Sequence, residues 1–352
     1  IADPNEVWHF EVFGEGPDKI GGVWAAVRIP DDHVGVSANI SRISTLDLKD
    51  KDRYMASENV FSVAKKMGFW DGKEPFKFWK AYSGGNYFGE PKAFSIREYF
   101  ILNALAPSLK LSYDSEELPI SVKPDKPVAV TDVMALLRQT YEGTEWDMTK
   151  NLKVAVKNKE TKETDTITSP AANPWMGTDM LNMLNGVKEG TVTRNRLVAV
   201  PQCSYSHVIQ LRSWLPDAVG GVAWLSFDNP GQSPRIPIFS GTTDLPAAFG
   251  ICGQHRHRED AIVWKYRTAN KPATVRWGLT KEKINGAVAH FEEKGLSEMP
   301  FVENRYKELQ DSKGEETARA FLTGYTADFA GATILRWQEM ADEFWKMFAR
   351  GF

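Results

Sequence analysis

The stretch YEGTEWDMTKN, residues 141–151, carries the most informative fold signal in the chain. The apolar spacing of residues 132–141 before it predicts a helix that Thr131 caps, and Gly143 is the residue type that commonly ends such a helix. A hydroxyl and several carboxylates follow in the loop. On residue types alone the stretch is typical of a helix C-terminus, although its carboxylates also suit the binding of an amino group.

A second informative stretch is VSANISRI, residues 36–43. The apolar run before it predicts a strand over residues 33–39 that ends in Asn39. An asparagine at a strand end is typical of a turn. Its side-chain amide would also suit donation of a hydrogen bond to a carbonyl oxygen that becomes negatively charged during acyl transfer.

A third stretch, RLVAVPQCSYSHVIQLR at residues 196–212, predicts strands over residues 196–200 and 207–211. Arg196 suits bidentate binding of a carboxylate, and His207 suits positioning of a substrate or a water. Each of these side chains is more often part of a structural ion pair or hydrogen bond. Cys203 precedes His207 by four residues, and on a strand this spacing separates them by about 13 Å, too far for a thiolate–imidazole pair.

Patterns on both sides of these stretches predict an α+β fold, with strands first and long helices last. A charged tip between two alternating segments predicts a protruding hairpin over residues 152–169. We find no repeat and no linker long enough to separate two domains. The remaining predicted strands are 6–13, 22–29 and 220–227, and the predicted helices are 57–68, 76–82, 95–105, 280–294 and 315–348.

Composition limits the partners. The 43 basic and 46 acidic residues give a net charge of −3, which offers no reason to expect nucleic acid or an anionic membrane surface as a partner. No window approaches the roughly 18 apolar residues of a membrane span. The two cysteines leave the compartment open.

Other catalytic signatures are weak. Cys252, His255 and His257 have the residue types of a metal site, but no fourth ligand is evident and a basic surface turn is the simpler interpretation. The sequence has no Gly-rich phosphate loop, no Gly-x-Ser-x-Gly elbow and no His-Glu-x-x-His. We therefore expect neither a metal nor a cofactor.

Taken in chain order, the three stretches resemble the cysteine dipeptidase family of N-terminal-nucleophile hydrolases, the dipeptidase A and secernin group. The resemblance extends to residues 1–8, 28–32, 55–68 and 237–246. It implies a four-layer αββα sandwich with a helical C-terminal region, in which residues 1–352 form the C-terminal major part of a single domain. Within it, the hairpin at about 152–169 would be an insertion and residues 315–350 a long helical tail.

The resemblance also implies a reaction. An N-terminal cysteine would attack the amide of a dipeptide or small peptide, and because Ile1 cannot serve as that nucleophile, we expect the cysteine in a missing N-terminal segment or chain. Asn39 would be the oxyanion donor. The residues implied in substrate binding are Arg42, Glu142, Thr144, Asp147, Arg196 and His207.

Two alternatives stay open. One is an amidase of the N-acyl amino acid or bile-salt type, which would share the oxyanion asparagine. The other is a catalytically inactive, secernin-like binding protein, for which the hairpin would suit a partner contact. The sequence leaves homo-oligomerisation and localisation undecided.

Overall fold

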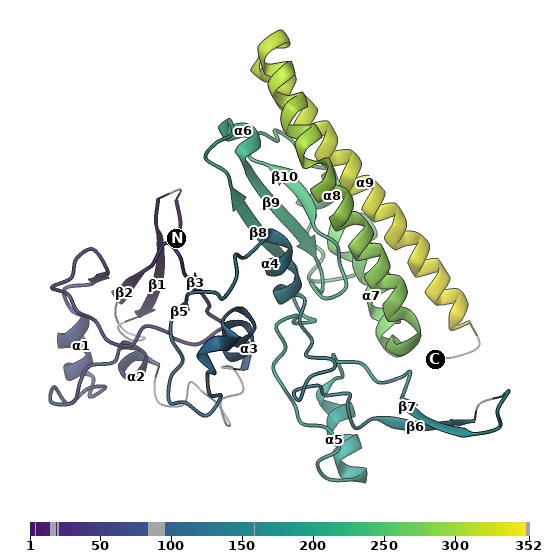
Figure 1. Ribbon diagram of the computed structural model, residues 1–352, viewed down its shortest axis with the longest axis horizontal. Coiled ribbons are helices and arrows are strands. Elements are labelled where there is room, and N and C mark those ends of the chain that lie inside the picture. The colour runs from purple at the N-terminus through teal and green to yellow at the C-terminus, as the bar shows by residue number, and fades with distance from the viewer. Residues whose placement is uncertain (4, 15–18, 20, 84–95, 158, 350–352) are drawn as a thin grey trace. The chain divides into compact units, whose positions relative to one another are not determined.

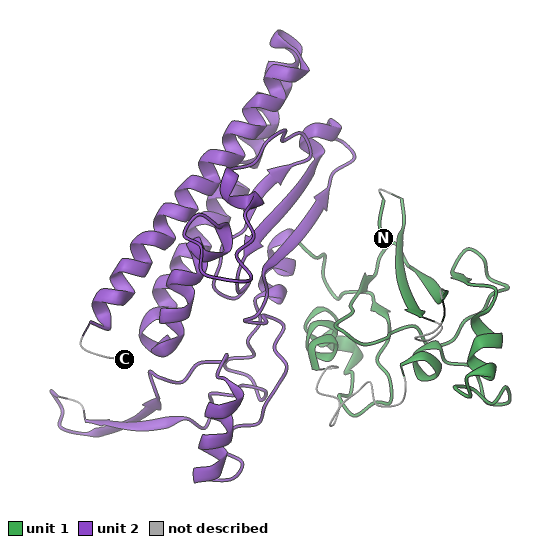
Figure 2. Cartoon of the chain, turned by 180° about the vertical axis from the view of Figure 1, so that it is seen from behind, with its two compact units in different colours: residues 1–129 green, residues 130–352 purple. Residues whose placement is uncertain are grey.

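The computed structural model describes residues 1–3, 5–14, 19, 21–83, 96–157 and 159–349 (Figure 1). The chain divides into two compact units, residues 1–129 and 130–352, which we call unit 1 and unit 2 (Figure 2). The single domain implied by the resemblance stays a prediction.

Unit 1 is built on a three-stranded antiparallel sheet of order β1-β2-β4. β1 spans Val7–Gly14, β2 spans Gly22–Ile29 and β4 spans Tyr54–Ala56. The first two confirm the predicted strands. The central strand β2 is mostly buried, since the helices α1 (Val60–Lys66) and α2 (Phe78–Tyr82) contribute residues to the same apolar core.

The rest of unit 1 is less regular. A two-stranded ladder joins β3 (Val34–Gly35) to β5 (Ser121–Val122). The predicted strand over residues 33–39 is wrong beyond Gly35, because Asn39 adopts a φ of 61°, which extended backbone does not allow. The other elements are α3 (Ile96–Leu105) and the 3₁₀ helix η2 (Pro107–Leu109); the predicted start of α3 at Ser95 lies outside the described residues.

Unit 2 contains an antiparallel sheet of order β10-β9-β8 beside a long helical pair (Figure 1). On β9, buried residues alternate with half-buried ones, and fully buried Trp224 belongs to the core cluster shared with the helices. A Cβ at Gly295 would lie 3.0 Å from the Trp224 ring, so this glycine allows the helix to approach the sheet closely. The strands are β8 (Tyr205–Leu211), β9 (Gly221–Phe227) and β10 (Ile236–Phe239).

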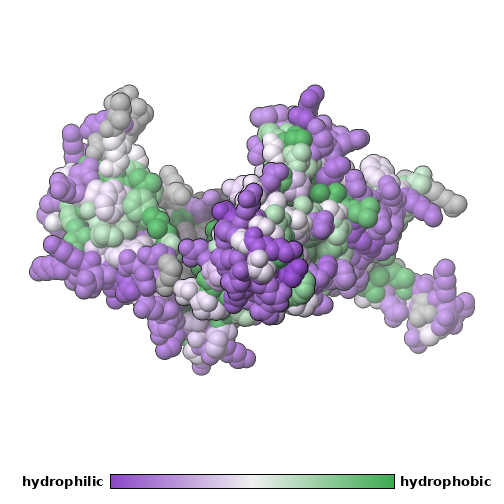
Figure 3. All heavy atoms as spheres, turned by 90° about the horizontal axis from the view of Figure 1, so that it is seen from above, coloured by the Kyte–Doolittle hydropathy of each residue, from purple (hydrophilic) through white to green (hydrophobic). Residues whose placement is uncertain are grey.

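The long helices of unit 2 contribute most residues of one apolar core cluster. α7 spans Ile262–Val275, α8 spans Trp277–Lys313 and α9 spans Glu315–Met347, which confirms the helical C-terminal region and extends the first predicted helix at both ends. Fully buried Trp337 packs against Tyr266 of α7, with ring centroids 5.5 Å apart. The turn between α8 and α9 faces the viewer in Figure 3 and is hydrophilic.

Shorter elements complete unit 2. The helix predicted over residues 132–141 ends earlier, at Leu137, and the predicted hairpin is present as β6 and β7; its status as an insertion stays a prediction. The predicted strand over residues 196–200 is absent: this described segment is buried at Leu197 and Ala199 but forms no ladder. The bounds are α4 (Val130–Leu137), β6 (Lys153–Lys157), β7 (Thr164–Thr168), α5 (Thr178–Val187), α6 (Asp217–Gly220) and η3 (Ala247–Gly250).

The described residues therefore form a mixed α and β structure with small antiparallel sheets and a helical C-terminal region. The four-layer sandwich stays a prediction. Among the described helices, none combines the length and the apolar composition needed to cross a membrane.

Candidate functional site

Asn39 lies on an exposed turn of unit 1, and its side chain is held in one orientation. Arg97 of α3 donates from Nη1 to the amide oxygen Oδ1 at 3.0 Å and from Nη2 to the carbonyl of Ala38 at 2.6 Å. The guanidinium is a donor only, so this contact assigns the oxygen and nitrogen of the amide. No described residue accepts a hydrogen bond from Nδ2 of Asn39. This nitrogen is a donor with spare capacity.

Two carboxylates, buried Glu98 and half-buried Glu11, hold the turn on either side of Asn39. Glu98 accepts from the backbone N–H of Ala38 at 2.6 Å, and burial, opposed by the charge of Arg42, raises its pKa. Glu11 of β1 accepts from the backbone N–H groups of Arg42 at 2.5 Å and Ile43 at 3.1 Å. The turn is therefore fixed by contacts to β1 and α3.

Arg42 is a buried structural cation in this unit. Its guanidinium donates to the carbonyls of Leu118 at 3.2 Å and Pro119 at 2.6 Å, and burial lowers its pKa. It also lines a pocket of about 190 Å³ together with Glu117. Its contacts are with the protein's own backbone, and its role in substrate binding stays a prediction.

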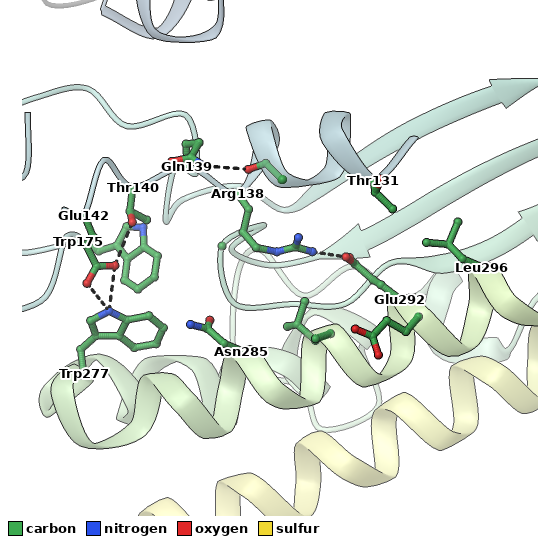
Figure 4. Close-up of a pocket in the computed structure, with 15 residues that line it drawn as sticks. Thr131, Arg138, Gln139, Thr140, Glu142, Trp175, Trp277, Asn285, Glu292 and Leu296 are labelled. Carbon is green, nitrogen blue, oxygen red and sulfur yellow. Dashed lines mark hydrogen bonds and ion pairs between the residues drawn. The ribbon is translucent and has the colours of Figure 1, made fainter. Parts of the chain in front are cut away.

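Glu142 lies in a larger pocket, of about 440 Å³, wholly within unit 2 (Figure 4). Its carboxylate accepts from Nε1 of Trp277 at 3.2 and 3.3 Å and from the hydroxyl of Thr140 at 3.0 Å. The ring of Trp175 meets that of Trp277 edge to face, with centroids 5.0 Å apart. This end of the pocket combines one carboxylate with two indole rings.

Arg138 and Glu292 face each other farther along the same pocket (Figure 4). Arg138 and Arg235 both donate to Oε1 of Glu292, the second at 3.2 Å. Arg235 is fully buried, and its Nε and Nη2 contact no acceptor among the described residues. Burial, with a contribution from Arg138, lowers the pKa of Arg235 to about 10.

Thr144 and Asp147 shape the loop that follows Glu142. Asp147 accepts from the backbone N–H of Gly143 at 3.0 Å and from both the N–H and the hydroxyl of Thr149 at 2.7 Å. Thr144 donates its hydroxyl to the carbonyl of Tyr141 at 2.7 Å. Neither side chain lines the pocket, and their predicted part in substrate binding stays a prediction.

The structure brings Arg196 close to this loop but leaves His207 on the sheet. The hydroxyl of buried Tyr141 donates to the carbonyl of Arg196 at 2.9 Å. His207 projects from the exposed face of the edge strand β8 and stacks with Tyr205. The predicted strand pair with Arg196 and His207 on its flanks is therefore wrong, because residues 196–200 form no strand.

Sequence reasoning missed several pocket and support residues, namely Arg97, Arg138, Trp175, Arg235, Trp277 and Glu292. They come from distant segments and form no local motif, so only their charge and aromatic character could have singled them out. Across the described residues, no group of three or more His, Cys, Asp or Glu side chains is arranged to hold a metal ion.

Comparison with known proteins identifies the family of this chain. Residues 1–290 match the model of peptidase family C69. The chain belongs to this family. The match ends within α8, so the rest of the helical pair lies beyond it.

Several curated proteins have related sequences. A probable dipeptidase of Latilactobacillus sakei is 27% identical over 252 residues, covering 70% of this chain and 44% of the relative. One of Salmonella dublin is 28% identical over 249 residues, 68% of this chain and 46% of the relative. Probable dipeptidase B of Streptococcus pyogenes serotype M1 is 24% identical over 324 residues, 90% of this chain and 54% of the relative. The chain thus spans about half the length of these relatives.

Proposed function

We propose that this chain belongs to a dipeptidase that hydrolyses dipeptides or small peptides through a cysteine nucleophile. Membership of the peptidase family and the names of its relatives support the reaction class. The observation that carries the proposal is the exposed amide of Asn39, whose oxygen is occupied by Arg97 while its nitrogen has no acceptor among the described residues.

This geometry suits stabilisation of an oxyanion. When a thiolate attacks a peptide carbonyl, negative charge develops on the carbonyl oxygen, and a preorganised N–H donor stabilises that charge. Arg97 keeps Oδ1 of Asn39 away from this task, so Nδ2 is the group available to the substrate. Glu11 and Glu98 keep the turn in place before substrate binds, so no reorganisation is needed during the reaction.

The experiment is a kinetic comparison of Asn39→Ala with the unmodified protein on dipeptide substrates. Loss of one oxyanion donor typically lowers kcat by about 10²–10³, and we expect a loss of this order with little change in KM. Asn304→Ala, on the exposed surface of α8, is the matched control and keeps its activity. Hydrolysis by Asn39→Ala within twofold of the control contradicts the assigned role.

The proposal assigns the nucleophile to an N-terminal cysteine outside residues 1–352. This chain has two cysteines, half-buried Cys203 and exposed Cys252. We expect the double variant Cys203→Ser and Cys252→Ser to keep hydrolysis that iodoacetamide abolishes, because the thiolate that attacks is elsewhere. Loss of hydrolysis in a correctly folded double variant would place the nucleophile within this chain.

A further inference from the structure

The pocket of unit 2 has opposite charges at two places along its length (Figure 4). Its volume of about 440 Å³ is that of a site for a small molecule. We propose that it binds a small peptide or amino acid as a zwitterion, with the ammonium group at Glu142 and the carboxylate at Arg138. The choice of this ligand rests on the proposed peptidase function, but the pocket itself does not depend on it.

The Glu142 end suits an ammonium group. Both carboxylate oxygens accept from Nε1 of Trp277, which fixes the carboxylate, and a neutral indole donor leaves its negative charge uncompensated. Trp175 and Trp277 line the pocket beside it, and indole faces attract cations. No described cation forms an ion pair with Glu142, so its carboxylate can form one with a cationic group of a ligand.

The Arg138 end suits a carboxylate. Arg138 and Arg235 carry two positive charges and share the single negative charge of Glu292, so this cluster of three side chains by itself has an excess of +1. The side chain of Arg138 is 21% exposed and lines the pocket, whereas that of Arg235 is 0% exposed behind it. Nη2 of Arg138 donates to Glu292, and a ligand carboxylate that accepts from the remaining terminal N–H groups of Arg138 would offset the excess.

The two ends together define a ligand class. A molecule with both a free ammonium and a free carboxylate satisfies both charges, whereas an N-acylated or amidated one leaves one of them uncompensated. Glu293, which lines the pocket from the exposed side of α8, adds negative charge and further disfavours a purely anionic ligand. The pocket therefore selects unblocked termini.

Binding is measured by calorimetry with the ketomethylene analogue of alanyl-alanine, in which a CH₂ group replaces the amide N–H and hydrolysis cannot occur. Its N-acetyl and C-terminal amide derivatives are the comparison probes. We expect each derivative to bind at least tenfold more weakly than the free analogue. Equal binding of the free and blocked probes, or no binding of the free probe at millimolar concentration, overturns the proposal.

Single substitutions at Glu142 and Arg138 test which end of the pocket binds the ammonium group and which binds the carboxylate. Glu142→Gln keeps an acceptor for Trp277 but loses the charge, and we expect at least tenfold weaker binding of the free and amidated probes with no change for the acetylated one. Arg138→Gln should weaken the binding of the free and acetylated probes and leave the binding of the amidated probe unchanged. Glu282→Gln, on an exposed position of α8, is the control and binds every probe as the unmodified protein does.

Loss of one probe class with retention of another also shows that a variant is folded. If a substitution weakens the binding of all three probes equally, the ligand group assigned to that residue is contradicted. The calorimetry needs no catalysis, so failure here leaves the Asn39 experiment intact, and failure of that experiment leaves the pocket intact.

Discussion

Replacement of Glu292 by glutamine tests the charge arrangement in unit 2 most sharply. Glu292 forms ion pairs with both Arg138 and fully buried Arg235, and both guanidinium groups donate to the same carboxylate oxygen. Glutamine keeps an oxygen at that position and the same shape. The substitution therefore removes the negative charge and little else.

The expected cost follows from burial. Removing one partner of a buried ion pair costs about 3–5 kcal/mol, because the remaining charge stays buried without compensation. The retained amide oxygen and the partial exposure of Arg138 place Glu292→Gln near the lower limit, about 3 kcal/mol. For a unit of this size, that loss corresponds to a fall in Tm of about 6–12 °C.

The assay is urea unfolding followed by tryptophan fluorescence. The neighbouring Glu293→Gln is a matched control, because Glu293 is exposed on the same helix, and we expect it to change the free energy of unfolding by less than about 0.5 kcal/mol. If Glu292→Gln is as stable as that control, Arg235 does not depend on this carboxylate and the charge argument for the pocket fails.

Three further substitutions give independent tests. Burial raises the pKa of Glu11, but hydrogen bonds, the largest from His9, outweigh it and leave the pKa below its usual value. The ionised Glu11 carboxylate therefore stabilises the fold above the pKa of the unfolded chain, and this stabilisation is lost as pH falls through the pKa of the folded state. In an acid titration followed by circular dichroism, the stability of unit 1 should fall less steeply below about pH 4 in Glu11→Gln than in the unmodified protein. Gly295→Ala places a Cβ 3.0 Å from Trp224 and should destabilise unit 2 by up to about 2 kcal/mol in urea unfolding, since overpacking outweighs the gain in helix propensity. Gly286→Ala, which meets nothing within 4 Å, should instead stabilise it by about 0.5–1 kcal/mol, and the opposite order of the two would contradict the packing of α8 on the sheet.

Local patterns predicted the elements whose buried faces follow a simple period. β2 matches its predicted bounds, and the long helices α8 and α9 were predicted from apolar spacing. The same reasoning failed at residues 33–39 and 196–200. An apolar run indicates burial, but a strand also needs backbone hydrogen bonds to a neighbouring strand. Asn39 and residues 196–200 do not pair with a strand in the structure.

The candidate site was predictable only in part. Asn39 and Glu142 stood out because each belongs to a local stretch with a family resemblance. Their partners did not, because Arg97 is separated from Asn39 by 58 residues and Glu292 from Arg138 by 154. Contacts across such separations depend on the tertiary fold, and a single sequence carries no periodic signal for them.

The most direct test of the account is hydrolysis of alanyl-alanine beside N-acetyl-alanyl-alanine and N-acetyl-alanine by the protein that contains this chain. Chromatography of the released amino acids measures each reaction. The account predicts that alanine is released from the free dipeptide, with little or none from the two acylated compounds. Release of alanine from N-acetyl-alanine and of alanyl-alanine from N-acetyl-alanyl-alanine, with no hydrolysis of the free dipeptide, would make the protein an acylase. No hydrolysis of any of the three compounds would favour a binding role.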